Sequence, residues 1–224
     1  MFPLSDVIPS RTTPVVTVTL IVMNVLVFIY QLMLPSPADE LFVQRYALIP
    51  AWFSWPTVLT SMFLHAGIWH VGPNMLYLWI FGDNVEDRLG HARYLGFYVF
   101  AGAVAAFAQL LINPFSTVPM VGASGAIAGV MGAYFVLYPQ SRVLTAVFVL
   151  IFFDIVEIPA IFFLGVWFLL QLLSGVGSLG VSNAAGGGTA FFAHIGGFVA
   201  GVIAGLFLRA RDRRWEPPVE GWPS

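Results

Sequence analysis

The sequence predicts an all-α integral membrane protein with six transmembrane helices, the fourth of them short and central. Of its 224 residues, 59% are hydrophobic and only 9% are charged, and the mean hydropathy is +0.88. A soluble domain carries about 25% charged residues, and a disordered chain combines low hydrophobicity with high charge. The composition therefore excludes both classes. The apolar residues are also grouped in stretches close to the ~20 residues that cross a bilayer.

The expected spans are separated by proline, glycine and charged residues. The first follows Pro14 and ends at Pro35, and it is too long for the apolar region of a cleavable signal peptide. We expect a cytoplasmic N-terminal segment (1–14), a six-helix membrane domain (15–208) and a cytoplasmic tail (209–224). The spans cover about residues 15–34, 58–81, 94–112, 122–139, 158–173 and 191–208.

The fourth span is slightly short for a hydrocarbon core of ~30 Å. It starts near Gly122 and stops at Pro139, and the uncharged, proline-containing stretch 113–121 precedes it. We expect this stretch to dip into the membrane, so that the helix begins below the surface. Non-helical backbone at that depth is tolerated only where protein or a water cavity satisfies it, which indicates a buried wet site.

Three connections have a distinct composition. Residues 35–58 are read as a loop whose Trp52 and Trp55 suit a membrane interface. Residues 143–157 are read as an interfacial loop with an apolar edge, ending in the charges of Asp154 and Glu157. Residues 174–190 form an uncharged, glycine-rich loop.

The arginines predict the orientation. Six spans place both termini on one side, and of the nine basic residues, all arginine, only Arg45 falls on the other side. Positively charged residues are enriched in cytoplasmic loops. Both termini are therefore expected in the cytoplasm.

His70 and Asn74 are polar residues on one face of the second span, at i and i+4. Such residues are costly in a membrane, which makes each one a functional hypothesis. Two readings stay open: an interhelical hydrogen bond, or a pair of donors that stabilises a developing negative charge.

Ser124 opens the fourth helix between glycines, in Gly122-Ala123-Ser124-Gly125. Glycine bares the backbone, and the first N–H groups of a helix have no partner within it. Serine in a membrane helix commonly bonds to its own backbone. The alternative is a nucleophile beside free N–H donors, although G-x-S-G alone is a weak signal.

His194 shares a helical face with Gly197, Gly201 and Gly205 in the sixth span, while Ser124, Ala128 and Gly132 share one in the fourth. Small-residue faces let two helices approach closely. Packing these faces together would bring serine and histidine within hydrogen-bonding reach, and a serine beside a base is the minimal activated nucleophile. The glycines could equally serve packing alone.

The sequence lacks the residues that other kinds of protease site require. No carboxylate is placed to complete a triad, because Asp154 and Glu157 fall on the cytoplasmic side. The chain has no cysteine and no H-E-x-x-H motif, so thiolate chemistry and that zinc site are excluded. A net charge of −2 gives no reason to expect nucleic acid as a partner.

Three motifs together resemble the rhomboid intramembrane serine proteases, over roughly residues 46–208. They are FLHAGIWHVGPNMLYLWIFGDNVEDRLG in the second span, VGASGAIAGVMGAYF opening the fourth, and AHIGGFVAG in the sixth. The six-helix bacterial form is the most similar, which implies a multi-pass protein of the bacterial plasma membrane. The resemblance implies an endopeptidase that needs no metal or cofactor and cuts transmembrane proteins near their outer end, through an acyl-enzyme.

The resemblance also assigns roles. Ser124 would be the nucleophile and His194 its base, with His70, Asn74 and the Ser124 N–H as the oxyanion hole. His65, Gly122, Gly125, Gly197 and Gly201 would be supporting residues, the loop 174–190 a mobile cap, and the fifth helix a lateral gate. One position departs from the family pattern: the aromatic residue four after the serine is here Ala128.

The remaining alternatives are a catalytically inactive rhomboid-like protein that binds membrane helices, or a small transporter that uses the histidines as a proton path. The expected partners are transmembrane substrates and the lipid bilayer. The small-residue faces could also support a homo-oligomer.

Overall fold

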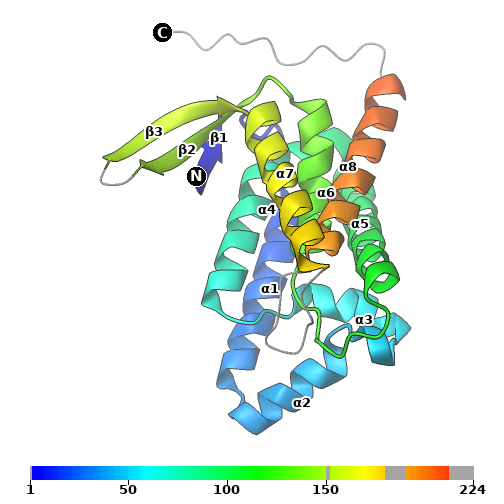
Figure 1. The fold of residues 1–224 in the computed structure, drawn as a ribbon. Coiled ribbons are helices and arrows are strands. Elements are labelled where there is room, and N and C mark those ends of the chain that lie inside the picture. The colour runs from blue at the N-terminus through cyan, green and yellow to red at the C-terminus, as the bar shows by residue number, and fades with distance from the viewer. Residues whose placement is uncertain (1, 150–151, 180–189, 212–224) are drawn as a thin grey trace.

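The computed structural model describes residues 2–149, 152–179 and 190–211, and most of these residues are helical (Figure 1). Part of the glycine-rich loop, residues 180–189, and the tail from residue 212 lie outside this range. The helices are α1 (Val15–Met33), α2 (Ser36–Tyr46), α3 (Trp55–Thr60), α4 (Ile68–Leu89), α5 (His91–Ile112), α6 (Ser124–Leu137), α7 (Ala160–Ser178) and α8 (Phe191–Arg211).

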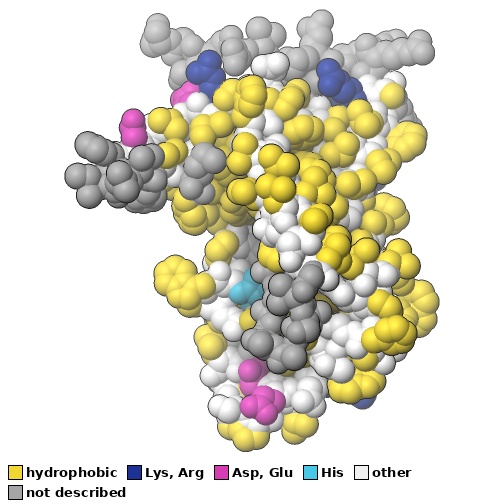
Figure 2. Space-filling view, in the orientation of Figure 1, with side chains coloured by type: hydrophobic (Ala, Val, Ile, Leu, Met, Phe, Trp, Pro, Cys, Tyr) yellow, Lys and Arg dark blue, Asp and Glu magenta, His cyan; other side chains and the backbone are white. Residues whose placement is uncertain are grey.

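Four of these helices, α1, α5, α7 and α8, have the length and apolar composition to cross a bilayer. The other two helices of the bundle do not meet both conditions. Helix α4 has 22 residues but ends in the charged sequence DNVEDRL, and the apolar helix α6 has only 14 residues. Figure 2 shows hydrophobic side chains over most of the visible face, with arginine side chains gathered mainly at one end.

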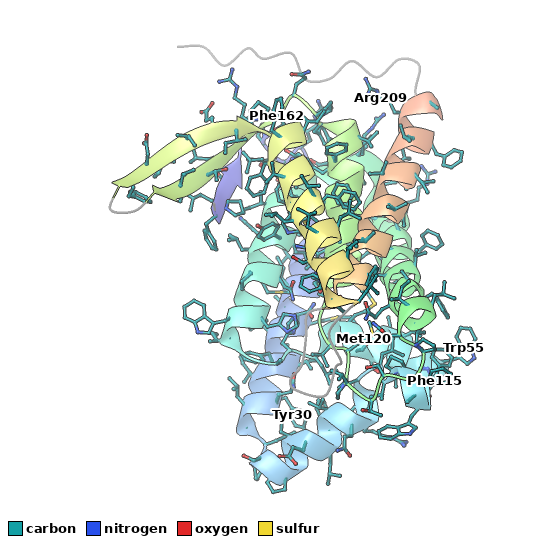
Figure 3. All side chains as sticks on the ribbon, in the orientation of Figure 1. Tyr30, Trp55, Phe115, Met120, Phe162 and Arg209 are labelled. Atoms are coloured by element: carbon teal, nitrogen blue, oxygen red, sulfur yellow. The ribbon has the colours of Figure 1, made fainter. Side chains whose placement is uncertain are left out.

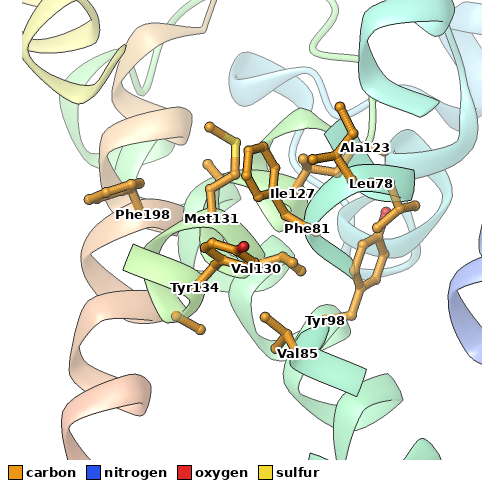
Figure 4. Packing of buried hydrophobic residues seen from close by; sticks show 14 of the residues in the cluster. Leu78, Phe81, Val85, Tyr98, Ala123, Ile127, Val130, Met131, Tyr134 and Phe198 are labelled. Atoms are coloured by element: carbon orange, nitrogen blue, oxygen red, sulfur yellow. The ribbon is translucent and has the colours of Figure 1, made fainter. Parts of the chain in front are cut away.

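Helix α6 is enclosed by its neighbours. Every residue from Ala126 to Leu137 is buried except Phe135, because α4, α5, α7 and α8 all pack against this helix. Figure 4 shows Phe81 of α4 and Tyr98 of α5 in the same buried cluster as Met131 of α6. The helix that Ser124 opens is therefore central in the bundle, while Ser124 itself is half-buried.

The acidic end of α4 fixes the start of α1. Glu86 is fully buried, and its carboxylate accepts the N–H groups of Val16 and Thr17 at 2.8 and 2.7 Å. The cap position of α1, Pro14, makes no side-chain cap hydrogen bond of its own. A carboxylate from another helix therefore satisfies the unpaired donors and the positive end of the dipole.

The fold is mostly helical, as expected, but it is not all-α, and the expectation of an interfacial loop at 143–157 is wrong. These residues form strands β2 (Arg142–Val149) and β3 (Phe152–Pro159), and β1 (Phe2–Asp6) completes a three-stranded antiparallel sheet in the order β1-β2-β3. The sequences RVLTAVFV and FFDIVEIP are rich in β-branched and aromatic residues, which suit a pleated sheet. Figure 1 shows the sheet projecting sideways from the end of the bundle where α7 begins and α8 ends.

The reading of residues 35–58 as a loop, and the start of the second span at residue 58, are also wrong. Helices α2 and α3 occupy much of this region, and α4 begins only at Ile68. A 3₁₀ turn (Ser61–Phe63) and an extended segment separate α3 from α4. The apolar sequence from residue 58 onward hides this break between the two helices. Figure 3 shows Trp55 and Phe115 at the end of the bundle opposite Arg209.

Candidate active site

Ser124 is the first residue of α6 and is half-buried. Gly122 precedes it with a φ of +115°, a conformation that favours glycine. The N–H of Gly122 donates to the carbonyl oxygen of Ser61 at 2.8 Å. This turn presents the serine hydroxyl together with the unpaired N–H groups of the first helical turn.

His194 of α8 reaches the serine directly. The distance between His194 Nε2 and Ser124 Oγ is 2.7 Å. Nε2 accepts the serine proton only when the ring carries its own proton on Nδ1. The arrangement is that of a hydroxyl beside a base, the minimum for an activated nucleophile.

Glycines make this distance possible by letting the backbones of α6 and α8 touch. A Cβ built on Gly197 would collide with the carbonyl oxygen of Gly125, and one on Gly201 would collide with that of Gly129. The small-residue face singled out for α8 therefore packs on α6, chiefly against Gly125 and Gly129, which lie next to the expected α6 face of Ser124, Ala128 and Gly132. Only glycine permits the approach at positions 197 and 201.

His70 and Asn74 lie beside the turn that precedes the serine. A Cβ built on Gly122 would lie 2.7 Å from His70 Nε2 and 3.6 Å from Asn74 Nδ2. Asn74 Nδ2 is buried and has no hydrogen-bond partner among the described residues. A buried donor without an acceptor is costly, unless it serves a ligand that forms there.

The tautomer of His70 can be read from its neighbour. The N–H of Ala66 donates to His70 Nδ1 at 3.4 Å, which makes Nδ1 an acceptor. The neutral ring then carries its proton on Nε2, the atom that faces Gly122. Two side-chain donors and the helix N-terminus thus converge near Ser124.

Comparison with known proteins supplies the family. A rhomboid domain is matched over residues 53–211, well over half of the chain. The chain belongs to the rhomboid family. It is 30% identical to "Rhomboid protein 1, mitochondrial" of Saccharomyces cerevisiae over 189 residues, which cover 77% of this chain and 49% of the relative. It is 42% identical to "Rhomboid protease GluP" of Bacillus subtilis over 79 residues, 35% of this chain and 15% of that protein.

This rhomboid chain spans about half the length or less of both relatives. Its apolar helices and its family together make it a multi-pass membrane protein. The second of these relatives is named a rhomboid protease.

His65 lies behind His70. Its ring is buried, and its centroid is 5.1 Å from that of His70 in an edge-on contact. Its backbone is fixed to α1, because Gln31 Oε1 accepts its N–H at 3.0 Å and Gln31 Nε2 donates to its carbonyl oxygen at 3.3 Å. These contacts fit a supporting position rather than direct contact with a substrate.

A cavity of about 40 Å³ lies beside Ser124. Methionine, alanine and glycine form much of its wall, including Met62, Ala105 and Ala193. Its volume is small, roughly that of a few water molecules by the same measure. The cavity is suited to a small group.

Sequence reasoning missed two residues of α7 that contact His194. Gln171 Oε1 lies 2.8 Å from His194 Nδ1, and the centroid of the Trp167 ring lies 6.0 Å from that of His194. The signal for Gln171 was present, because an amide inside an apolar span is unusual. Trp167 is one aromatic residue among many, and the sequence offers no signal for it.

Proposed function

We propose that this rhomboid chain is an intramembrane serine endopeptidase that uses Ser124 and His194 as a catalytic dyad. The observation that carries the proposal is the 2.7 Å distance between His194 Nε2 and Ser124 Oγ. Membership of a family that includes a named rhomboid protease supports the same reaction class.

In the proposed mechanism, His194 Nε2 takes the proton from Ser124 Oγ while Oγ attacks the scissile carbonyl carbon. The resulting oxyanion is held by Asn74 Nδ2, His70 Nε2 and the backbone N–H of Ser124. His194 gives its proton to the leaving amine, and an acyl-enzyme remains. Water then attacks the ester with His194 again as base, which restores the serine.

The proposed topology has six spans, with α4 and α6 added to the four long apolar helices. Helix α6 would begin inside the membrane, so that Ser124 lies towards the outer face. Both termini and the arginine-rich end would be cytoplasmic in a bacterial plasma membrane. The substrate would be a transmembrane helix that enters past α7 as a lateral gate and is cut near its outer end.

The cavity beside Ser124 supports a preference for a small residue before the cleaved bond. Its volume of about 40 Å³ and its wall of alanine and glycine favour a small side chain. One extra methylene group in a pocket changes discrimination by about 1–3 kcal/mol. Substrates with alanine before the bond should therefore be cut faster than the same substrates with leucine.

The deciding experiment is cleavage of a transmembrane test substrate by the purified chain in detergent, beside Ser124→Ala. We expect the variant to lose at least about 10³-fold in kcat/KM, because the nucleophile is gone. Equal cleavage by both proteins would mean a contaminant and would overturn the dyad.

A fluorophosphonate probe separates the remaining outcomes. If the chain cuts none of several substrates but Ser124 is labelled, the dyad is active and the substrate is still to be found. An unlabelled Ser124 would favour the inactive, helix-binding rhomboid-like protein or the transporter.

A further inference from the structure

Two side chains of α7 support His194 from the same side. Trp167 and Gln171 are four residues apart, so they share one face of the helix. Gln171 Oε1 lies 2.8 Å from His194 Nδ1, and the Trp167 ring lies beside the imidazole with an angle of 37° between the ring planes. Both side chains are half-buried.

The contacts from Gln171 and Trp167 meet two different requirements of a catalytic base: the correct tautomer and a fixed ring orientation. Nε2 is directed at Ser124 Oγ, so Nδ1 must carry the ring proton if His194 is to act on the serine. A carbonyl oxygen only accepts, and Gln171 Oε1 can therefore pair only with a protonated Nδ1. The imidazole ring must also be kept from rotating away, and a neighbouring aromatic ring restricts that motion.

Position 128 explains why this support comes from α7. Ala128 is fully buried, and its methyl group lies against Gly197, with 3.4 Å to a Cβ built there. A methyl group at this position offers no ring surface to His194. The ring contact to His194 is instead made by Trp167.

We propose that Gln171 is a positioning residue that holds His194 in the tautomer with the proton on Nδ1, and that Trp167 supports the ring in place of an aromatic residue at position 128. The inference rests on the proposed Ser124–His194 function. It makes the base of the dyad depend on α7, which is attached to α8 by the stacked pair Phe168 and Phe198, with ring centroids 4.6 Å apart.

The test compares Gln171→Leu, which removes the acceptor at similar size, with Gln171→Glu, which keeps an acceptor oxygen. The control is Leu170→Met, a neighbouring change at a side chain that is 54% exposed. Each variant is assayed for kcat and KM on a transmembrane substrate and for the rate of fluorophosphonate labelling of Ser124. The labelling rate reports the dyad without requiring a substrate helix to pass α7.

We expect Gln171→Leu to lower kcat and the labelling rate by about 10–100-fold, the loss seen when the partner that orients a metal-bound histidine is removed. KM should change little. Gln171→Glu should recover most of the rate, and Leu170→Met should match the parent. Labelling of Gln171→Leu at the parent rate, or an equal loss in a folded Gln171→Glu, would overturn the proposal.

A spectroscopic readout separates this inference from the protease assignment. The ¹⁵N shifts of the imidazole of His194, assigned with His194→Asn, should show Nδ1 protonated and Nε2 bare in the parent, and a mixture of tautomers in Gln171→Leu. The same tautomer population in both proteins would also overturn the positioning role. If the parent neither cuts nor labels, the protease function fails, while this measurement still decides the role of Gln171. Gln171→Met serves as a second variant if Gln171→Leu does not fold.

Discussion

Asn74 presents the least satisfied atom of the proposed oxyanion hole. Its Nδ2 is buried and lacks an acceptor among the described residues. This atom lies close to the turn before Ser124, because a Cβ built on Gly122 would be 3.6 Å from it. An unmade hydrogen bond costs free energy in the resting protein. The same donor can be satisfied when a negative oxygen forms near Ser124, so its contribution would arise in the transition state.

Asn74→Ala should therefore lower kcat by about 10²–10³-fold, the cost of one oxyanion donor, with little change in KM. Thermal stability should hardly change, because Nδ2 makes no hydrogen bond within the described part of the fold. Asn24→Ala is the matched control: the Asn24 amide is buried and donates to Leu20 at 2.8 Å. That variant should lose stability and keep its kcat, and an unchanged kcat in Asn74→Ala would contradict the oxyanion role.

The residues of the candidate site differ in how well the sequence alone predicts them. His70, Asn74, Ser124 and His194 are polar side chains where lipid penalises them, and their spacings place them on defined helical faces. Their catalytic roles stay a prediction. Gln171 carries the same penalty, but its partner lies 23 residues further along the chain on another helix, and no local spacing reveals such a pairing.

At the scale of elements, the contact between α6 and α8 sets the distance between the serine and the histidine. Gly201 faces the carbonyl oxygen of Gly129, and no atom can be added there without separating the backbones. The dyad lies at one end of this contact. Any separation of the two helices should therefore lengthen the hydrogen bond between Ser124 Oγ and His194 Nε2.

Gly201→Ala should destabilise the protein by about 1–3 kcal/mol, the usual cost of overpacking, and should also lower kcat. Gly96→Ala on α5 is the control, because a Cβ there meets no atom within 4 Å. It should be neutral or stabilising by up to about 1 kcal/mol, since alanine favours helix over glycine. Thermal unfolding in detergent and cleavage assays check both variants, and equal behaviour would contradict the close-packing argument.

The carboxyl group of Asp6 ties strand β1 to helix α6. The Tyr134 hydroxyl donates to Asp6 at 2.5 Å. Burial raises the pKa of Asp6 from 3.8 to about 7, and the nearby Asp83 carboxylate acts in the same direction, whereas the Tyr134 hydrogen bond opposes it. A raised pKa in the folded state means that the folded protein holds a proton which the unfolded chain releases near pH 4.

The contribution of Asp6 to stability should therefore be complete below pH 4 and lost as the pH rises through about 7. Between pH 5 and 8, the unfolding temperature of the parent should fall relative to that of Asp6→Asn, which cannot ionise. Parallel curves for the two proteins over this range would show that Asp6 is not buried as described.

The elements themselves were only partly predictable. The apolar runs that became α1, α5 and α8 were long and bounded by proline, glycine or charge, so their extents agree closely with the sequence reading. The strands were missed because hydrophobic residues in β2 and β3 do not alternate strictly with polar ones. Their partner β1 also lies at the far end of the chain, where no local pattern reveals it.

For the whole molecule, the proposed orientation can be tested with single cysteines, because the chain has none of its own. Gln44 of α2 and Asp154 of β3 are both exposed and lie at opposite ends of the bundle. In spheroplasts, a membrane-impermeant maleimide should label Gln44→Cys at once, and Asp154→Cys only after permeabilisation. The reverse pattern would invert the topology.

The pairing of β1 with β2 has a consequence for biosynthesis. Asp6 pairs with Val143, so the first strand leaves the ribosome long before its partner exists. At roughly 5–20 residues per second, the wait is on the order of ten seconds, during which α1, α4 and α5 are already available for insertion. The sheet can close only after α6 has been made, and its closure therefore marks a late step in the assembly of the membrane domain.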